Sequence, residues 1–188
     1  MASIGLIIVA VVAVAGIAYF IGIYNGLVEV KNNIDKAWGN IDVLLKQRHD
    51  EIPKLIKTCE AYMQYEKSTL TEVIALRNAA SSARTVGEKA IKEGELTASL
   101  GRLFALSENY PDLKAQTNFQ NFQKRVSELE SDIADRREFY NESVNNYNIR
   151  IQSFPDSLVA NNMNLQPREM FKVTEAERKD VDVSFKVP

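Results

Sequence analysis

His49 and Cys59 are the side chains of this 188-residue chain best suited to nucleophilic catalysis or to binding a soft metal ion, and the sequence holds one of each. A cysteine nucleophile needs a base that faces it. His49 lies ten positions before Cys59 with Pro53 between them, which argues against such a pair. Asp50 follows His49 directly, but neighbouring residues of a helix point in different directions. We therefore predict a histidine on a helix seam or surface, and a buried cysteine that packs as a small hydrophobic residue.

The sequence also lacks the common motifs of catalytic and ligand-binding sites. It has no glycine-rich phosphate loop, no Glu-x-x-His pair of a di-metal bundle and no nucleophile turn. One histidine and one cysteine cannot form the ligand cluster of a structural zinc site. The 23 basic and 25 acidic residues are mixed along the chain, and this balance offers no basic stripe to a nucleic acid. We predict no catalytic, metal-binding or cofactor-binding residues, no cofactor, no nucleic-acid partner and no enzymatic activity.

Tyr-Asn pairs are the polar feature that the sequence repeats. Tyr24-Asn25 follows an apolar run, and "YNESVNNYN" at 140–148 holds two further pairs. Asparagine is a poor helix former, and hydrogen bonds between helices, which fix register, would compensate for its presence. If the last helix runs antiparallel to the first, the two segments meet at the membrane end of a bundle. The alternative is exposed helix with coincidental similarity.

The apolar run from Ile4 to Ile23 is about 20 residues long, enough to cross a hydrocarbon layer of about 30 Å as one helix. Tyr19 and Tyr24 fall at its C-terminal end, where aromatic rings favour the membrane interface. A cleaved signal peptide is the alternative, because Ala13-Val14-Ala15 fits a cleavage site. The run has no basic residue before it and stays apolar beyond that site, which favours a retained single-pass anchor.

Small residues recur every four positions at the end of this run. Ala18, Gly22 and Gly26 would let two helix backbones approach closely within a membrane. A simpler explanation is that glycine and alanine are common in such helices. The candidate membrane-association residues are therefore Ala18, Tyr19, Gly22, Tyr24 and Gly26.

Basic residues follow the run, and none precedes it. The first are Lys31, Lys36, Lys46 and Arg48. By the positive-inside tendency we expect the N-terminus outside and the C-terminal domain in the cytoplasm.

Beyond Gly26 the apolar residues recur at steps of three, four or seven, as in helices that pack one stripe against a partner. This spacing continues to about Ala83, with a kink expected near Pro53. A second helix is predicted to begin around Thr85–Glu88 and to stop before Pro111, and a third covers 119–151.

The predicted fold class is all-α. It consists of a short tail (1–3), a transmembrane helix (4–23), a long-helix antiparallel bundle of three to four coiled-coil-like helices (24–154) and an extended C-terminal arm (155–188). Alternating apolar residues at 181–187 predict one short extended segment within that arm.

Polar and aromatic residues interrupt the apolar stripes. We expect contacts between helices or subunits at Asn25, Asn32, Trp38, Arg48, Tyr140, Asn141, Tyr147 and Asn148. Arg48, Arg136 and Arg137 are charges near the seams, and the alternative to ion pairing is a solvated head on a packed stem. Their candidate partners within a turn or two are Asp42, Asp50, Glu128, Asp132 and Asp135.

Several long stretches resemble the LemA family. They are "YNGLVEVKNNIDKAWGNIDVLLKQRHDEIPKLI" from Tyr24, "NYPDLKAQTNFQNFQKRVSELESDIADRREFYNESVNNYN" from Asn109, and the closing "FPDSLVA" and "MFKVTEAERKDVDVSF". The resemblance covers nearly the whole chain after residue 20. Gln47, Glu51 and Lys54 depart from the residues that this family commonly has at those positions.

This resemblance implies a single-pass protein of the bacterial inner membrane with a mostly α-helical domain and no established activity. A magnetosome-associated relative points to membrane organisation. We expect a non-enzymatic scaffold that self-associates at the membrane, with lipid and further copies of the chain as partners, and that organises or remodels the membrane. The alternative is an adaptor or sensor that docks a membrane protease or signalling protein.

Overall fold

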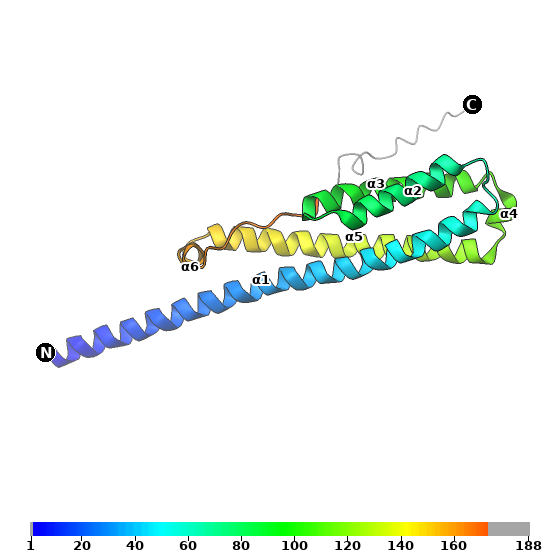
Figure 1. Cartoon of the computed structure of the whole chain (residues 1–188). Coiled ribbons are helices and arrows are strands. Elements are labelled where there is room, and N and C mark those ends of the chain that lie inside the picture. Colours follow the sequence, from blue (N-terminus) through cyan, green and yellow to red (C-terminus); the bar gives the residue numbers. More distant parts are fainter. Residues whose placement is uncertain (1, 173–188) are drawn as a thin grey trace, which may run out of the picture. The chain divides into compact units, whose positions relative to one another are not determined.

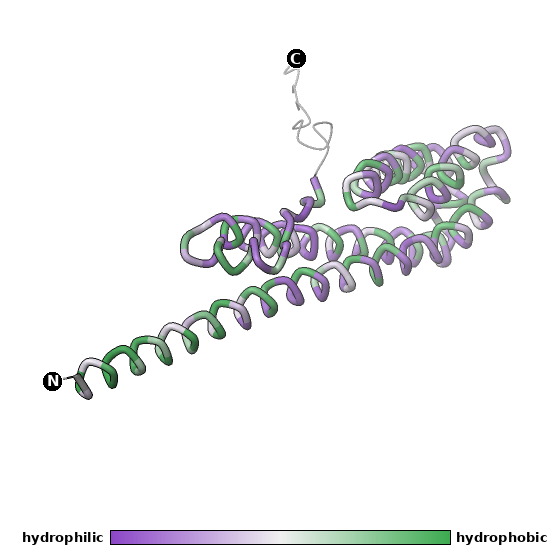
Figure 2. Tube along the Cα trace, turned by 60° about the vertical axis from the view of Figure 1, so that its left-hand side comes forward, coloured by the Kyte–Doolittle hydropathy of each residue, from purple (hydrophilic) through white to green (hydrophobic). Residues whose placement is uncertain are grey.

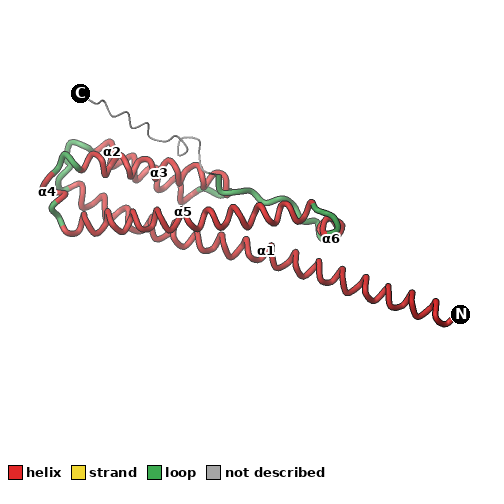
Figure 3. Tube along the Cα trace, turned by 180° about the vertical axis from the view of Figure 1, so that it is seen from behind, coloured by secondary structure: helices red, strands yellow, loops and turns green. Residues whose placement is uncertain are grey.

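The computed structural model describes residues 2–172, and every regular element among them is a helix (Figures 1 and 3). The helices are α1 (Ala2–Glu60), α2 (Lys67–Ser82), α3 (Val86–Ser107), α4 (Pro111–Lys114), α5 (Thr117–Gln152) and α6 (Asp156–Asn162). The described chain divides into two compact units. We call residues 2–39 with 139–169 the anchor unit, and residues 40–138 with 170–172 the bundle unit.

In the anchor unit, α1 begins as an apolar helix that the rest of the described chain does not bury. Every side chain from Ser3 to Gly22 is exposed, and these turns are mostly coloured as hydrophobic in Figure 2. Mean hydropathy reaches 2.8 in this part of α1, which by length and composition can cross a membrane. The predicted span 4–23 is thus the start of a longer helix, and burial begins at Ile23.

Beyond the exposed turns, the part of α1 in the anchor unit packs against α5, and the two helices are antiparallel. The rings of Trp38 and Tyr140 lie 5.4 Å apart, and the guanidinium of Arg150 lies over Gly26. Higher residue numbers of α5 therefore face lower numbers of α1. The antiparallel order predicted for the first and last helices is present in this unit.

In the bundle unit, segments of α1 and α5 combine with α2 and α3. The short connection between α2 and α3 makes them antiparallel neighbours, as the Glu72–Arg102 ion pair between them indicates. Thr85 caps α3, because its hydroxyl accepts a hydrogen bond from the Glu88 backbone N–H, so the predicted start of this helix is confirmed.

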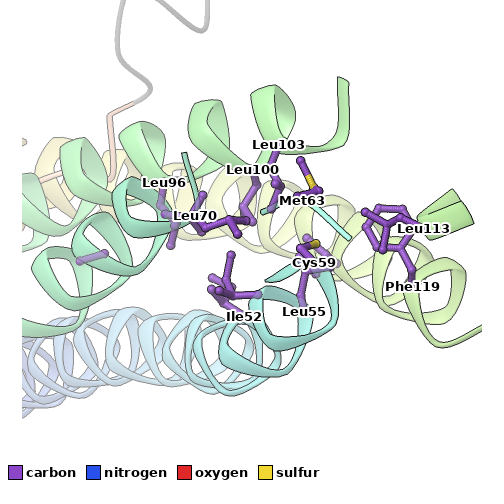
Figure 4. Close-up of a cluster of buried hydrophobic side chains, with 14 residues drawn as sticks. Ile52, Leu55, Cys59, Met63, Leu70, Leu96, Leu100, Leu103, Leu113 and Phe119 are labelled. Atoms are coloured by element: carbon purple, nitrogen blue, oxygen red, sulfur yellow. The ribbon is translucent and has the colours of Figure 1, made fainter. Parts of the chain in front are cut away.

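The core of the bundle unit follows the predicted apolar stripes (Figure 4). Side chains from α1 to α5 and from the turn between α1 and α2 fill it, and they are almost completely buried. Its buried members are Ile52, Leu55, Ile56, Cys59, Met63, Leu70, Val73, Ala80, Leu96, Leu100, Leu103, Leu113, Phe119 and Val126.

Two boundaries differ from the sequence prediction. Helix α1 continues through Pro53 but ends at Glu60, and α2 begins at Lys67, so the helical stretch predicted to run to Ala83 is broken. The predicted extended arm, which starts at 155, contains the short helix α6. The extended segment predicted at 181–187 lies outside the described residues.

Candidate functional site

Residues 163–169 form an irregular segment of the anchor unit that we call the strap. The strap begins where α6 ends. Asn164 adopts a left-handed conformation with φ 52°, and Leu165 N–H donates to the carbonyl of Ala160 while Asn164 N–H donates to that of Asn161. These are the two hydrogen bonds of a Schellman helix end, which asparagine tolerates better than most residues.

Tyrosine and asparagine side chains of the 140–148 segment of α5 form hydrogen bonds with the backbone of the strap. Asn148 donates from Nδ2 to the Arg168 carbonyl at 2.9 Å and accepts at Oδ1 from the Arg168 N–H at 2.8 Å. Tyr147 donates its hydroxyl to the carbonyl of Gln166 at 3.1 Å. Tyr140 does the same to the carbonyl of Glu169 at 2.9 Å. The strap has no regular secondary structure to pair its backbone N–H and C=O groups, and these side chains of α5 supply hydrogen-bond partners for them.

Burial and charge reinforce these contacts. Burial is the main cause that raises the pKa of both Tyr140 and Tyr147, which keeps their hydroxyls protonated as donors. Arg168 also lies 3.6 Å from the Asp35 carboxylate of α1, although both side chains are about half exposed. This ion pair therefore adds little stability to that of the hydrogen bonds.

The two Tyr-Asn segments occupy different environments from those expected. Tyr140, Tyr147 and Asn148 hydrogen-bond to the strap, whereas the sequence predicted contacts between helices or subunits for these residues. Asn25 and Asn32 are exposed on α1. Of the remaining predicted contact residues, Trp38 packs on Tyr140, and Asn141 is half-buried.

We predict that Asn148→Ala frees the strap while leaving the helices folded. Loss of the paired hydrogen bonds should lower local stability by about 1–3 kcal/mol. Amide hydrogen exchange should accelerate at 165–169 by roughly tenfold or more, because each 1.4 kcal/mol is a factor of ten. Asn145→Ala, an exposed position of the same helix, is the matched control. Equal protection of the strap in both variants would contradict its dependence on Asn148.

Arg48 is the centre of a buried charged cluster in the bundle unit. Its guanidinium, only 1% exposed, forms ion pairs with Glu93 of α3 and Glu130 of α5. It also donates to the Thr97 hydroxyl at 2.9 Å. The Thr97 hydroxyl donates in turn to the carboxylate of Glu130. Three helices are thereby joined at one point.

His49 completes the cluster from the adjoining position of α1. Its Nε2 lies 3.0 Å from the nearer carboxylate oxygen of Glu93, and its ring is almost buried. The backbone carbonyl of His49 accepts from Nε of Arg77 on α2 at 3.1 Å. Of the two positions predicted for His49, a helix seam or the surface, the buried ring therefore occupies the seam.

Charge compensation decides the ionisation of Glu93. Burial alone would raise the pKa of this carboxyl, but the hydrogen bond from His49 and the charge of Arg48 outweigh burial and lower its pKa. Glu93 is therefore ionised at neutral pH. The cluster therefore acts as an electrostatic joint between helices.

We predict that this cluster makes the stability of the folded chain depend on pH in the acidic range. A group whose folded-state pKa is lowered contributes stability above its unfolded pKa and loses it as the pH falls through the folded value. The urea midpoint should therefore fall as the pH is lowered from about 5 to 3. In Glu93→Gln the fall should be smaller, although the midpoint at pH 7 should already be reduced. Identical pH dependence of the two proteins would contradict the assignment.

Glu93, Thr97 and Glu130 were not identified from the sequence. The partners expected for Arg48 were wrong: Asp42 pairs with Lys89 at 2.7 Å, and Asp50 pairs with Lys46 at 3.0 Å. The position of Glu93 could have indicated its burial, because it falls between Ala90 and Leu96 on the buried face of α3. Of the other seam arginines, Arg136 is exposed, and Arg137 lies 4.7 Å from the ring of Phe171.

The candidate membrane-association residues divide into two groups. Ala18, Tyr19, Gly22 and Tyr24 are exposed, and a side chain added at Gly22 would meet no atom within 4 Å. Gly26 is different, because the Arg150 side chain covers it. The small-residue face that is open to another helix therefore ends at Gly22.

Cys59 lies in the core of the bundle unit, as predicted. It is completely buried, and burial raises the pKa of its thiol to about 12. A thiol that stays protonated is a poor nucleophile. In the described residues, 2–172, no group of three or more His, Cys, Asp or Glu side chains is arranged to hold a metal ion.

Comparisons with known proteins identify a family and several relatives. The family model described as "LemA family" matches residues 37–185. Protein LemA of Metamycoplasma hominis is 28% identical over 172 residues, which cover 90% of this chain and 78% of that protein. Magnetosome protein MamQ 2 of Paramagnetospirillum magneticum is 25% identical, covering 82% of this chain and 67% of that protein. Magnetosome protein MamQ of Magnetospirillum gryphiswaldense is 23% identical, with coverages of 70% and 58%.

Proposed function

Because the chain belongs to the LemA family and is a membrane-associated helical protein, we propose that it is a non-enzymatic scaffold whose copies associate at the bacterial inner membrane. It would cross the membrane once, with the N-terminus outside and the bundle unit in the cytoplasm. Its partners would be lipid and further copies of the chain. The similarity to proteins named as magnetosome proteins supports a role in organising a membrane.

One observation carries this proposal: the exposed apolar surface of α1. From Ser3 to Gly22 no residue is charged, and none is buried by the described part of the chain. Large apolar side chains exposed all around a helix are unfavourable in water but favourable in a hydrocarbon layer. The surface therefore requires lipid, another helix or both.

Association between copies is supported by the shape of this surface. Ala10, Val11, Val14, Ala15 and Ala18 line a shallow apolar hollow, and Gly22 continues it with open space. Small side chains let helix backbones approach, and close packing drives association where lipid is as apolar as the helix. We propose that two copies meet along this face.

Cysteine crosslinking in native membranes tests that contact. The buried Cys59 is first replaced by serine, and a cysteine is then introduced in Ala18→Cys or in Phe20→Cys. Two residues correspond to about 200° around a helix, so these exposed positions lie on nearly opposite faces. We expect mild oxidation to give a covalent dimer of the Ala18→Cys protein, at several-fold higher yield than for Phe20→Cys. Equal yields would contradict the proposed face.

A different observation favours the alternative function, an adaptor. The turn between α1 and α2 carries a mainly apolar pocket of about 390 Å³. Its lining includes Ile56, Met63, Leu70 and Ile74, with Glu60 and Lys67 at the polar side. A pocket of this size fits an apolar side-chain group of a membrane protease or signalling protein. Crosslinking from Gln64 to one enriched partner, with a monomeric chain, would favour the adaptor over the scaffold.

A further inference from the structure

The turn between α5 and α6 exposes large apolar side chains. Phe154 is 81% exposed and Leu158 is 64% exposed, although both lie in a folded part of the anchor unit. Val159 and Ala160 of the same segment are buried, so α6 already packs on its neighbours through another face. An exposed phenylalanine and leucine four residues apart form an apolar surface with no covering group in the described anchor unit.

Helix geometry sets the level of this turn along α1. Arg150 lies over Gly26, and α5 runs antiparallel to α1 and ends two residues later at Gln152. The Trp38–Tyr140 contact and the Arg150–Gly26 contact place the end of α5 level with about residues 24–26 of α1. The apolar span predicted from the sequence ends close to this level, at Ile23. Figures 1 and 3 both show α6 beside this part of α1.

Aromatic side chains of α1 lie within about two turns of this level. Tyr19, Phe20 and Tyr24 are all exposed. Tyrosine is enriched where a membrane meets water, because its ring is apolar and its hydroxyl is polar. Phe154, just beyond the end of α5 and far from α1 in the sequence, is a further exposed aromatic side chain near this level.

Several polar groups of the turn are paired within the protein, which lowers the free-energy cost of approaching lipid. The carboxylate of Asp156, between Phe154 and Leu158, accepts from Nε of Arg150 at 2.5 Å. The backbone N–H groups of Ser153, Ser157 and Leu158 donate to carbonyls of Ile149, Ser153 and Pro155, respectively. Unpaired backbone groups would oppose entry into an apolar layer.

We propose that the α5–α6 turn is a second membrane contact, in which Phe154 and Leu158 insert at the boundary between lipid headgroups and acyl chains. The turn lies at the level where the span ends, and this position at the proposed membrane surface identifies lipid as its partner. Two elements of the anchor unit then meet the same bilayer surface. The inference rests on the proposed membrane anchor, and does not require association between copies.

Tryptophan fluorescence in vesicles tests the proposal with the full-length chain. Trp38 is the one native tryptophan, so Trp38→Phe is the background. Phe154→Trp is the probe. Phe139→Trp is the matched control, because Phe139 is also exposed but lies roughly 20 Å further along α5. Each protein is reconstituted in phosphatidylcholine vesicles with and without lipid brominated near the headgroup end of its acyl chains, which quenches nearby tryptophan.

Insertion predicts quenching of Phe154→Trp at least three-fold stronger than that of Phe139→Trp, together with blue-shifted emission. Equal quenching of the two variants would overturn the proposal. Blue-shifted emission without quenching would also overturn it, because protein would then cover the turn instead of lipid. Flotation with the vesicles separates the two claims: a chain that does not float contradicts the membrane anchor, whereas a floating chain with an unquenched probe contradicts this inference alone.

Discussion

Replacing Arg48 with methionine should lower the free energy of unfolding by about 3–5 kcal/mol, the loss expected when a buried ion pair is broken on one side. The substitution keeps the volume of the stem but leaves the Glu93 carboxylate, only 2% exposed, without its main cation. It also removes the link to Glu130 and Thr97, and therefore one joint between α1, α3 and α5. Urea unfolding of the protein in mild detergent, followed by circular dichroism, measures the change.

Two controls separate this effect from general damage. Lys46→Met removes an exposed i,i+4 ion pair with Asp50 and should change stability by less than about 0.5 kcal/mol. The double variant Arg48→Met with Glu93→Leu removes both buried charges and should recover part of the loss. A single Arg48→Met variant as stable as the Lys46→Met control would show that the cluster is unimportant for folding.

Phe119→Ala should have an effect of similar size, about 3–5 kcal/mol, through a cavity in the core of the bundle unit. Phe119 is completely buried, and its ring meets that of Phe104 edge to face at 6.3 Å. Figure 4 shows it beside Leu113, at the end of the core where α4 and the start of α5 meet. Few neighbours there can move to fill the space, because the backbone turns twice within a few residues.

The matched control for this substitution is Phe139→Ala. Phe139 belongs to the same helix but is 53% exposed, so its loss should change stability by about 0.5 kcal/mol or less. The same urea titration measures both variants. Equal losses for the two phenylalanines would contradict the assignment of Phe119 to the core.

The helices could be predicted because their apolar residues repeat over many turns. The long repeat of 119–151 corresponds to α5, and the capping pattern at Thr85 marks the start of α3. Short elements were harder to predict. Helix α6 has seven residues, too few for a period to be visible, and the apolar spacing between Cys59 and Leu70 runs across the break at 61–66 without a change.

Long-range polar contacts could not be predicted from spacing. Glu93 and Glu130 are 45 and 82 positions from Arg48, whereas spacing along one helix identifies only partners within a turn or two. Asn148 has a backbone partner in a segment without periodicity. The sequence thus indicated which residues were polar among apolar stripes, but the three-dimensional fold was needed to identify their partners.

The particle mass of the full-length protein in mild detergent tests the proposed scaffold most directly. The comparison is a chain that starts at Gly22, which lacks the span but keeps the buried Ile23 and Leu27 of the anchor unit. Light scattering coupled to chromatography gives the protein mass of each. The scaffold predicts a uniform oligomer of the full-length chain and a smaller particle without the span. A monodisperse monomer in both cases would contradict self-association, and leave the adaptor as the better account.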